Sequence, residues 1–118
     1  MDNIAPDITR QRLLIEGYYT IDMDAEKTGT FMTQLADHLG LRHYAKPMVH
    51  APGGSGKDSN QGFDAFLPLI DSGISLYVWT NSKFFACVLF TCKAFDVEKT
   101  LSFTKEFFQV NKIVHKEF

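Results

Sequence analysis

The tripeptide Asp71-Ser72-Gly73 interrupts two apolar segments and carries a hydroxyl group that can act as a nucleophile. A serine beside a glycine can sit in a strained turn, facing the carbonyl group of the residue before it, here Asp71. The same residues also suit an ordinary tight turn, because Asp and Ser form local backbone hydrogen bonds and Gly relieves strain. The residue types alone leave both interpretations open, a self-reactive peptide bond or a simple chain reversal.

A second segment, GGSGK at residues 53–57, resembles part of a phosphate-binding loop. That motif requires glycine at position 51 and a hydroxyl residue at position 58, where this chain has Ala51 and Asp58. An aspartate there would repel a phosphate and supplies no hydroxyl for magnesium. We therefore predict a polar surface loop over residues 52–62, of the length that can serve as a lid, and no nucleotide hydrolysis.

The histidines and cysteines do not predict a metal site. Cys87 and Cys92 are five residues apart in one expected strand, so their side chains should point to opposite faces of a sheet and can neither pair nor share a metal. Free thiols are typical of a reducing compartment such as the cytoplasm. The histidines lack ligand spacing and are expected to be scattered; they are His38, His43, His50 and His115.

Length and composition predict one domain spanning residues 1–118. The formal net charge is −2 and the pI is about 6.0, so nothing favours nucleic acid or an anionic membrane as a partner. No apolar run approaches the roughly 20 residues of a membrane-spanning helix, and residues 1–12 do not resemble a secretory signal. These features predict a cytoplasmic protein.

Six strands are predicted from alternating or β-branched runs, over residues 12–20, 44–51, 63–70, 74–79, 84–92 and 113–117. Two amphipathic helices are predicted behind capping aspartates: Asp22 or Asp24 before a helix that ends near Leu39, and Asp96 before a helix over residues 97–108. Gly40 is placed to end the first helix, and Pro47 favours an edge position for the second strand. The short links between the central strands require antiparallel pairing. The predicted fold class is therefore α+β, a two-layer sandwich with a mainly antiparallel sheet and both helices on one face.

The turn expected at residues 80–83 sets a register for the central hairpin. Trp79 should lie opposite Phe84, and Tyr77 opposite Ala86.

This register puts the side chains of Tyr77, Trp79 and Cys92 on one face. Ser72 has the opposite parity, so we expect a bend at Gly73 to bring it round to that face.

The segment from Asp71 to Cys92 resembles the core of the short, bacterial-type S-adenosylmethionine decarboxylases, which use a pyruvoyl group. In that family a cysteine at the end of a Phe-Thr-Cys triplet follows the cleaved serine by twenty residues. Here Phe90-Thr91-Cys92 ends twenty residues after Ser72. Residues 12–18 (RLLIEGY) resemble the family's first strand, and the resemblance covers most of the chain outside the loop at 52–62.

The resemblance implies a chain that cuts itself. Ser72 would attack the Asp71 carbonyl group, and the residue would become a pyruvoyl group at the new N-terminus. Cys92 would return a proton to the substrate carbon. The implied substrate is S-adenosylmethionine, or a related amino acid or amine, in polyamine (spermidine) synthesis. The family also implies a homodimer and no metal.

Several positions depart from the family pattern. Tyr77 replaces the processing histidine, Asp64 replaces a second processing serine, Gly73 replaces the histidine after the cleaved serine, and Asn81 replaces an acidic residue that holds the ribose hydroxyls. A phenol with a reference pKa near 10 is a poor base at neutral pH, so Tyr77 would need a lowered pKa or Asp64 would have to act instead. Trp79 retains an aromatic ring suited to stacking on adenine.

Three functions remain open on these residues. The retained Ser72 and Cys92 favour a working, self-processed pyruvoyl decarboxylase. The substitutions favour a non-processing, inactive homologue that binds a nucleoside or amine ligand or regulates an active partner. An interaction module that shares only the fold is the third.

Overall fold

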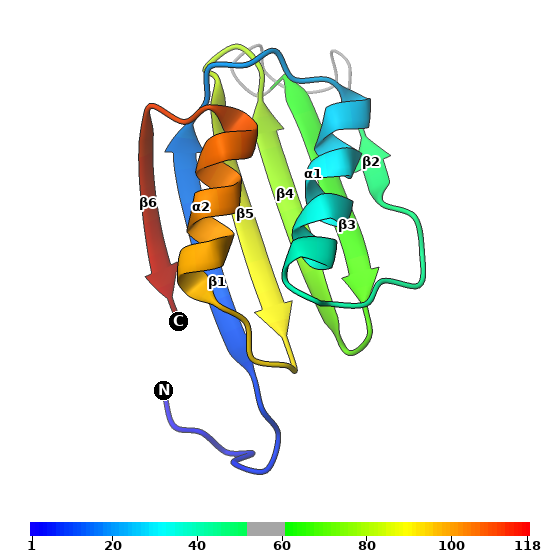
Figure 1. Ribbon diagram of the computed structural model, residues 1–118, viewed down its shortest axis with the longest axis vertical. Coiled ribbons are helices and arrows are strands. Elements are labelled where there is room, and N and C mark those ends of the chain that lie inside the picture. The colour runs from blue at the N-terminus through cyan, green and yellow to red at the C-terminus, as the bar shows by residue number, and fades with distance from the viewer. Residues whose placement is uncertain (52–60) are drawn as a thin grey trace.

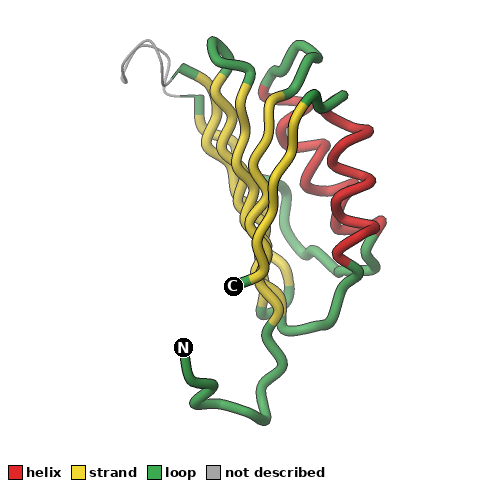
Figure 2. Tube along the Cα trace, turned by 90° about the vertical axis from the view of Figure 1, so that its left-hand side faces the viewer, coloured by secondary structure: helices red, strands yellow, loops and turns green. Residues whose placement is uncertain are grey.

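The computed structural model describes residues 1–51 and 61–118 and contains one six-stranded sheet with two helices (Figure 1). Every neighbouring strand pair is antiparallel, in the order β2-β3-β4-β5-β1-β6. Both helices lie on the same side of the sheet (Figure 2). The predicted two-layer α+β sandwich is confirmed. The strands are β1 (Gln11–Tyr18), β2 (Met48–His50), β3 (Gly62–Leu69), β4 (Ser72–Trp79), β5 (Phe84–Thr91) and β6 (Lys112–Glu117), and the helices are α1 (Ala25–His38) and α2 (Val97–Phe108).

Both helices begin at aspartate caps. The side chain of Asp24, the second of the two predicted candidates, accepts a hydrogen bond from the Lys27 backbone N–H at 2.7 Å. Asp96 accepts one from the Lys99 N–H at 3.0 Å, as predicted. Gly40 follows α1 with a φ of 68°, the left-handed conformation that glycine adopts at low cost. Local sequence therefore defines where both helices begin and where α1 ends.

The second strand is shorter than predicted. The prediction covered residues 44–51, but within that range only Met48–His50 pairs with β3. His43, just before it, forms an isolated bridge with Leu69 of β3. Pro47 comes directly before β2, which lies at the edge of the sheet as predicted, where a residue without a backbone N–H is tolerated. Most of the predicted glycine-rich loop, with its phosphate-loop and lid interpretations, falls at residues 52–60, outside the described residues.

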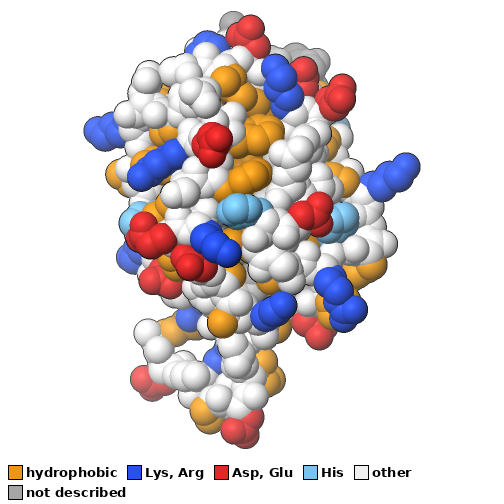
Figure 3. Space-filling view, viewed as in Figure 1, with side chains coloured by type: hydrophobic (Ala, Val, Ile, Leu, Met, Phe, Trp, Pro, Cys, Tyr) orange, Lys and Arg blue, Asp and Glu red, His pale blue; other side chains and the backbone are white. Residues whose placement is uncertain are grey.

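The core lies between the helices and one face of the sheet. Phe31 of α1, Phe85 of β5 and Phe108 of α2 are fully buried there. The Phe108 ring centroid lies 4.3 Å from that of Phe85 and 4.8 Å from that of Phe31. Outside these rings, the helix side of the molecule carries charged side chains of both signs scattered among uncharged ones (Figure 3). The packing of these aromatic rings holds both helices against the sheet and fills the core between the two layers.

The opposite face of the sheet is not covered by either helix (Figure 2). On it Phe66, Tyr77 and Phe90 are 37%, 39% and 41% exposed, although large apolar side chains usually gain from burial. We call this side the open face. By strand register its side chains include Leu14, Glu16, Met48, His50, Asp64, Phe66, Ser75, Tyr77, Trp79, Phe84, Ala86, Val88, Phe90 and Val114.

Candidate functional site

A two-residue link, Ile70 and Asp71, joins β3 to β4, and Leu69 pairs with Ser72 across it. Asp71 has a φ of 54°, in the left-handed region that a residue with a Cβ occupies at a cost of about 1 kcal/mol. The strained residue is the one whose carbonyl group precedes Ser72. The tight turn and the potentially reactive peptide bond are therefore the same feature.

The bend predicted at Gly73 is not observed. Gly73 pairs regularly with Pro68 on β3 and with Phe90 on β5, so the ladder continues through it. The reversal is instead complete at Asp71, and Ser72 is the first residue of β4. Ser72 keeps the parity of the helix-covered side, because two flanking strands hold the backbone of β4 in register.

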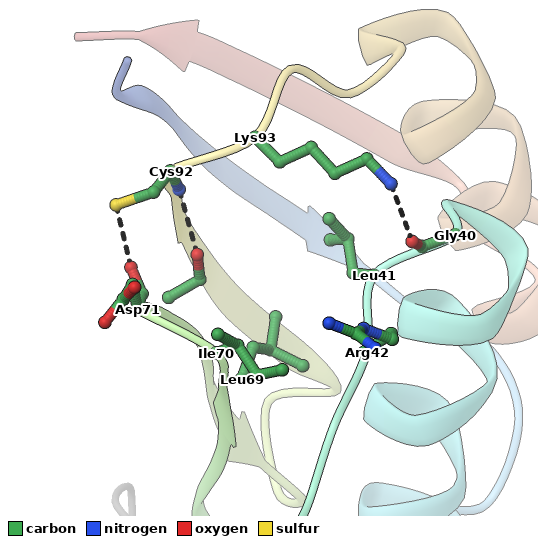
Figure 4. A pocket seen from close by; sticks show the side chains of 9 residues that line it. Gly40, Leu41, Arg42, Leu69, Ile70, Asp71, Cys92 and Lys93 are labelled. Atoms are coloured by element: carbon green, nitrogen blue, oxygen red, sulfur yellow. Dashed lines mark hydrogen bonds between the residues drawn. The ribbon is translucent and has the colours of Figure 1, made fainter. Parts of the chain in front are cut away.

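Cys92 reaches this turn from the end of β5. Its backbone N–H donates a hydrogen bond to Ser72 Oγ at 2.9 Å, and its thiol donates one to the Asp71 carbonyl oxygen, also at 2.9 Å (Figure 4). The serine and the cysteine thus contact the same peptide unit from residues twenty positions apart. The pairing of β4 with β5 determines this meeting.

The arrangement suits attack on the Asp71 carbonyl group. A thiol that donates to the carbonyl oxygen draws electron density from the carbon and stabilises the negative charge that develops on oxygen when a nucleophile adds. The Cys92 N–H holds Ser72 Oγ in place, and Ser72 follows the target carbonyl directly in the chain. Nucleophile and target therefore lie at one turn, and the end of β5 brings the oxyanion donor to it.

A pocket of about 300 Å³ adjoins this turn (Figure 4). It lies between the β3–β4 link and the segment that follows α1, and Arg42 and Lys93 place two cationic side chains in its wall. The Lys93 ammonium group donates to the Gly40 carbonyl oxygen at 3.1 Å. The pocket has the volume of a small-ligand site.

The two cysteines differ sharply in environment, although neither forms a disulfide. Cys87 is opposite Ile15 and Leu76 in the core, and burial raises the pKa of its thiol to about 12. It therefore stays protonated and inaccessible at neutral pH. Cys92 is half-buried and lines the pocket, so it is the thiol available for chemistry.

The remaining predicted site residues lie elsewhere on the sheet. The predicted pairs of Trp79 with Phe84 and of Tyr77 with Ala86 are confirmed. At about 3.3 Å per residue, however, Tyr77 lies roughly 16 Å and Trp79 roughly 23 Å along β4 from Ser72. Asn81, in the turn after β4, is farther still.

Asp64 pairs directly with Tyr77. A single chain therefore separates the predicted residues into a group at the Asp71–Ser72 turn and a group on the open face.

The group on the open face also includes His50, one of the histidines that were expected to be scattered. His50 pairs with Asp64, which in turn pairs with Tyr77, so the three side chains form a row across β2, β3 and β4. They line a pocket of about 430 Å³ together with Phe66 and Ser75. No spacing rule along the chain could identify His50, because its position depends on the register between β2 and β3.

Gly73 lies under an aromatic ring. A Cβ atom built on Gly73 would lie 2.6 Å from the edge of the Phe66 ring. The ring thus fills the space that a side chain at position 73 would need. This packing gives a physical reason for glycine at position 73.

Neither a metal centre nor a membrane segment emerges from the part of the chain that the structure describes. Within residues 1–51 and 61–118 no three His, Cys, Asp or Glu side chains are grouped to hold a metal ion. No helix in those ranges has the length and apolar character needed to cross a bilayer.

Comparison with known proteins agrees with this fold. The crystal structure of the adenosylmethionine decarboxylase from Aquifex aeolicus VF5 has the same fold, with a TM-score of 0.69 over 94% of this chain and 89% of that chain, at 12% sequence identity. A model of the S-adenosylmethionine decarboxylase family matches residues 12–118. The chain therefore belongs to the S-adenosylmethionine decarboxylase family. No curated protein matches the sequence at a significant level.

Proposed function

We propose that this protein cleaves itself between Asp71 and Ser72, converts residue 72 into a pyruvoyl group, and decarboxylates S-adenosylmethionine or a related amino acid in polyamine synthesis. One observation carries the proposal: Cys92 donates to both reacting groups, through its N–H to Ser72 Oγ and through its thiol to the Asp71 carbonyl oxygen, each at 2.9 Å. Family membership supplies the reaction class.

The first step is a shift of the acyl group from nitrogen to oxygen. Ser72 Oγ adds to the Asp71 carbonyl carbon, the peptide C–N bond breaks, and an ester and a free amine form. The Cys92 thiol stabilises the oxyanion during this step. The left-handed conformation of Asp71 favours the change, because strain at that residue can relax when the peptide bond opens.

The second step removes the ester by elimination. A base takes the Cα proton of residue 72, the Cα–Cβ double bond forms, and the Asp71 carboxylate leaves with the Cβ–O electron pair. Water then replaces the amine nitrogen, releasing ammonia and leaving the keto group. The products are two chains, residues 1–71 and a chain that begins with the former Ser72.

Cys92 has a second task in the proposal. The pyruvoyl group, once formed, serves as the electron sink for loss of carbon dioxide. The Cys92 thiol beside it is placed to return a proton to the substrate carbon. Trp79 and Asn81 are proposed to hold the adenine ring and the ribose, respectively.

Two copies of the chain are needed to assemble this site. Trp79 and Tyr77 are too far along β4 to act on the turn of their own chain. The exposed apolar side chains of the open face favour a homodimer in which two sheets pack face to face. The free cysteines agree with a cytoplasmic location.

Intact mass measurement of the purified protein tests self-cleavage directly. The uncut chain has a mass of 13.4 kDa. Cleavage before Ser72 should give fragments of roughly 8 and 5 kDa, at about 110 Da per residue. Release of carbon dioxide from carboxyl-labelled S-adenosylmethionine, compared with other labelled amino acids, then identifies the substrate.

The Ser72→Ala variant is the matched control, because it removes one oxygen atom and leaves the turn sequence intact. It should remain at 13.4 kDa under all conditions. A wild-type chain that stays uncut after long incubation contradicts the pyruvoyl mechanism. That outcome would favour the inactive homologue that binds a nucleoside or amine ligand or regulates a partner.

A further inference from the structure

Cys92 lies just outside the regular elements that flank it. Strand β5 ends at Thr91 and helix α2 begins at Val97, so residues 92–96 form a β5–α2 linker that the sheet ladder does not hold. The proposed acyl shift nevertheless requires both Cys92 bonds, each 2.9 Å long, to stay on the Asp71–Ser72 peptide. A misplacement of about 1 Å can lower a reaction rate by about 100-fold. Other contacts must therefore fix this linker.

The side chain of Gln11 holds the linker at Phe95. Its Nε2 group donates to the Phe95 carbonyl oxygen at 3.0 Å, and its Oε1 accepts a hydrogen bond from the Phe95 backbone N–H, also at 3.0 Å. An amide side chain offers both a donor and an acceptor, so it matches the two polar groups of a peptide backbone. The two bonds join the first residue of β1 to a linker 84 positions further along the chain.

The register of β1 on β5 places Gln11 for this contact. Gln11 pairs with Thr91, two positions beyond the pair of the buried Leu13 and Leu89. Because side chains alternate along a strand, Gln11 and Thr91 point to the same, helix-covered side as these leucines. Helix α2 lies on that side (Figure 2), so the linker that leads to it passes the Gln11 side chain.

The linker is also held at Lys93, next to Cys92. The hydroxyl group of the fully buried Thr91 donates to the Lys93 carbonyl oxygen at 2.7 Å. The Lys93 ammonium group donates to the Gly40 carbonyl oxygen at 3.1 Å and so connects the linker to the segment after α1. Cys92 therefore lies between the end of a paired strand and a linker that is bonded at Lys93 and at Phe95.

The strands and helices around this contact do not depend on the Gln11 side chain. The backbone of Gln11 pairs with Thr91 whichever side chain it carries, and the ladder continues along the rest of β1. The Phe95 ring lies in the core, and Asp96 caps α2 through its own carboxylate. Loss of the Gln11 amide should therefore release the backbone of the linker while the fold remains.

We infer that Gln11 is a positioning residue for self-cleavage, because its two bonds to Phe95 hold Cys92 against the Asp71–Ser72 peptide. The inference rests on the self-cleavage proposed above and adds a residue to it. Gln11 does not touch the reacting atoms and acts through Cys92, whose thiol and N–H contact them. Gln11 precedes residues 12–118, over which the family model matches, so family membership assigns it no role.

An isosteric Gln11→Glu variant tests these two bonds. A carboxylate has the shape of the amide and can still accept from the Phe95 N–H, but it cannot donate to the Phe95 carbonyl oxygen and repels it. Formation of the ester should slow by about 10- to 100-fold, because Cys92 is then less well oriented. Intact mass over time measures the loss of uncut chain, and hydroxylamine, which cleaves esters, should release little further fragment. Gln11→Ala, which removes both bonds, should slow the reaction at least as much.

Gln109→Ala is the matched control. The Gln109 side chain also donates to a backbone carbonyl oxygen, that of Glu106 at 2.7 Å, but it lies at the end of α2 away from the linker. This variant should cleave at the wild-type rate. Wild-type cleavage in both Gln11 variants overturns the inference and leaves the proposed function standing.

Thiol labelling separates a loosened linker from a weakened fold, and it does not require cleavage. The Ser72→Ala chain stays uncut and keeps the thiol of Cys92 beside the Asp71 carbonyl oxygen. In that chain, either Gln11 substitution should speed the labelling of Cys92 by iodoacetamide by about 10-fold, whereas the fully buried Cys87 should stay protected.

Two labelling results would overturn the inference. Faster labelling of both thiols would show that Gln11 stabilises the whole fold and not the linker. Unchanged labelling of Cys92 would show that Gln11 does not hold it. A wild-type chain that forms neither the cut nor a hydroxylamine-sensitive ester instead defeats the proposed function itself, whatever the labelling of Cys92 shows.

Discussion

The two faces of the sheet are built from the same strands but have different compositions and surroundings. On the covered face, Phe85 and Leu76 are fully buried against helices and neighbouring strands. On the open face, the apolar Phe66 and Phe90 remain exposed, and the ionisable Asp64 lies among them. Residues one position apart therefore belong to different environments, because side chains alternate along a strand.

The difference separates folding from function. The covered face packs to completion within one chain, so its residues specify the fold. The open face leaves apolar surface and ionisable groups available, which is costly for a monomer. Under the proposed function, a second copy would cover this surface. The predictions below measure this contrast, from the largest expected effect to the smallest.

Truncating a phenylalanine should lower stability far more on the covered face than on the open face. Phe85→Ala should lower the free energy of unfolding by about 3–5 kcal/mol, because it removes a fully buried ring that stacks on Phe108. Phe90 lies on the same strand, but its side chain points to the open face. Phe90→Ala should therefore lower the free energy of unfolding of the monomer by less than about 1 kcal/mol. Urea denaturation at low protein concentration measures both.

The same pair of variants also tests the proposed homodimer. Phe90→Ala should weaken self-association, measured by analytical ultracentrifugation, while the fold is retained. Equal destabilisation by the two variants would show that the open face is already packed within one chain.

The two thiols should differ in reactivity by at least about 100-fold, since a fully buried group reacts only when the structure opens. Cys92 is half-buried and lines the pocket, whereas Cys87 is fully buried. Iodoacetamide labelling followed by peptide mass mapping should therefore modify Cys92 first. Addition of denaturant should abolish the difference, and rapid labelling of Cys87 without denaturant would contradict the assignment of its face.

Two glycines provide a matched comparison of packing. A Cβ atom at Gly17, on the covered face, would lie 2.7 Å from the Lys112 carbonyl oxygen and 3.1 Å from the Phe85 ring. Gly17→Ala should therefore cost about 1–3 kcal/mol. At Gly73 the obstacle is the Phe66 ring, which is 37% exposed and can move outward, so Gly73→Ala should cost less than about 1 kcal/mol. Thermal unfolding ranks the two variants, and a larger loss for Gly73→Ala would show that the Phe66 ring is fixed.

Alkaline pH should act through the covered face. Burial raises the pKa of Cys87 from 9.0 to about 12, so between these values the unfolded chain loses a proton that the folded chain keeps. The contribution of Cys87 to the free energy of unfolding is therefore fully present below pH 9. It is lost as the pH rises towards 12, by up to about 1.4 kcal/mol per pH unit. Tyr19, whose pKa burial raises from 10.0 to about 12, contributes in the same direction above pH 10.

A Cys87→Ala variant should lose the cysteine part of this dependence, although its stability at neutral pH will be lower because of the cavity. Denaturation midpoints at several pH values measure the slope. An identical slope in the variant would assign the effect to Tyr19 alone.

Local patterns in the sequence were sufficient for most of the fold. The aspartate caps at Asp24 and Asp96, the glycine at Gly40 and the alternation in β4 each act within a few residues, so their structural consequences are readable along the chain. The fold class followed from the order of these elements and their short links. The prediction of β2 extended too far, because an edge strand that pairs on one side only receives little support from its own sequence.

By itself the sequence determined the elements, their order, the resemblance to a family and the twenty-residue spacing of Ser72 and Cys92. Only the tertiary structure decided which side chains meet. It joined Cys92 to the Asp71–Ser72 peptide, set Tyr77 apart from it, and brought His50 beside Asp64. The physical reason is that periodicity reports which face a residue occupies, whereas cross-strand register depends on hydrogen bonds between segments far apart in the chain.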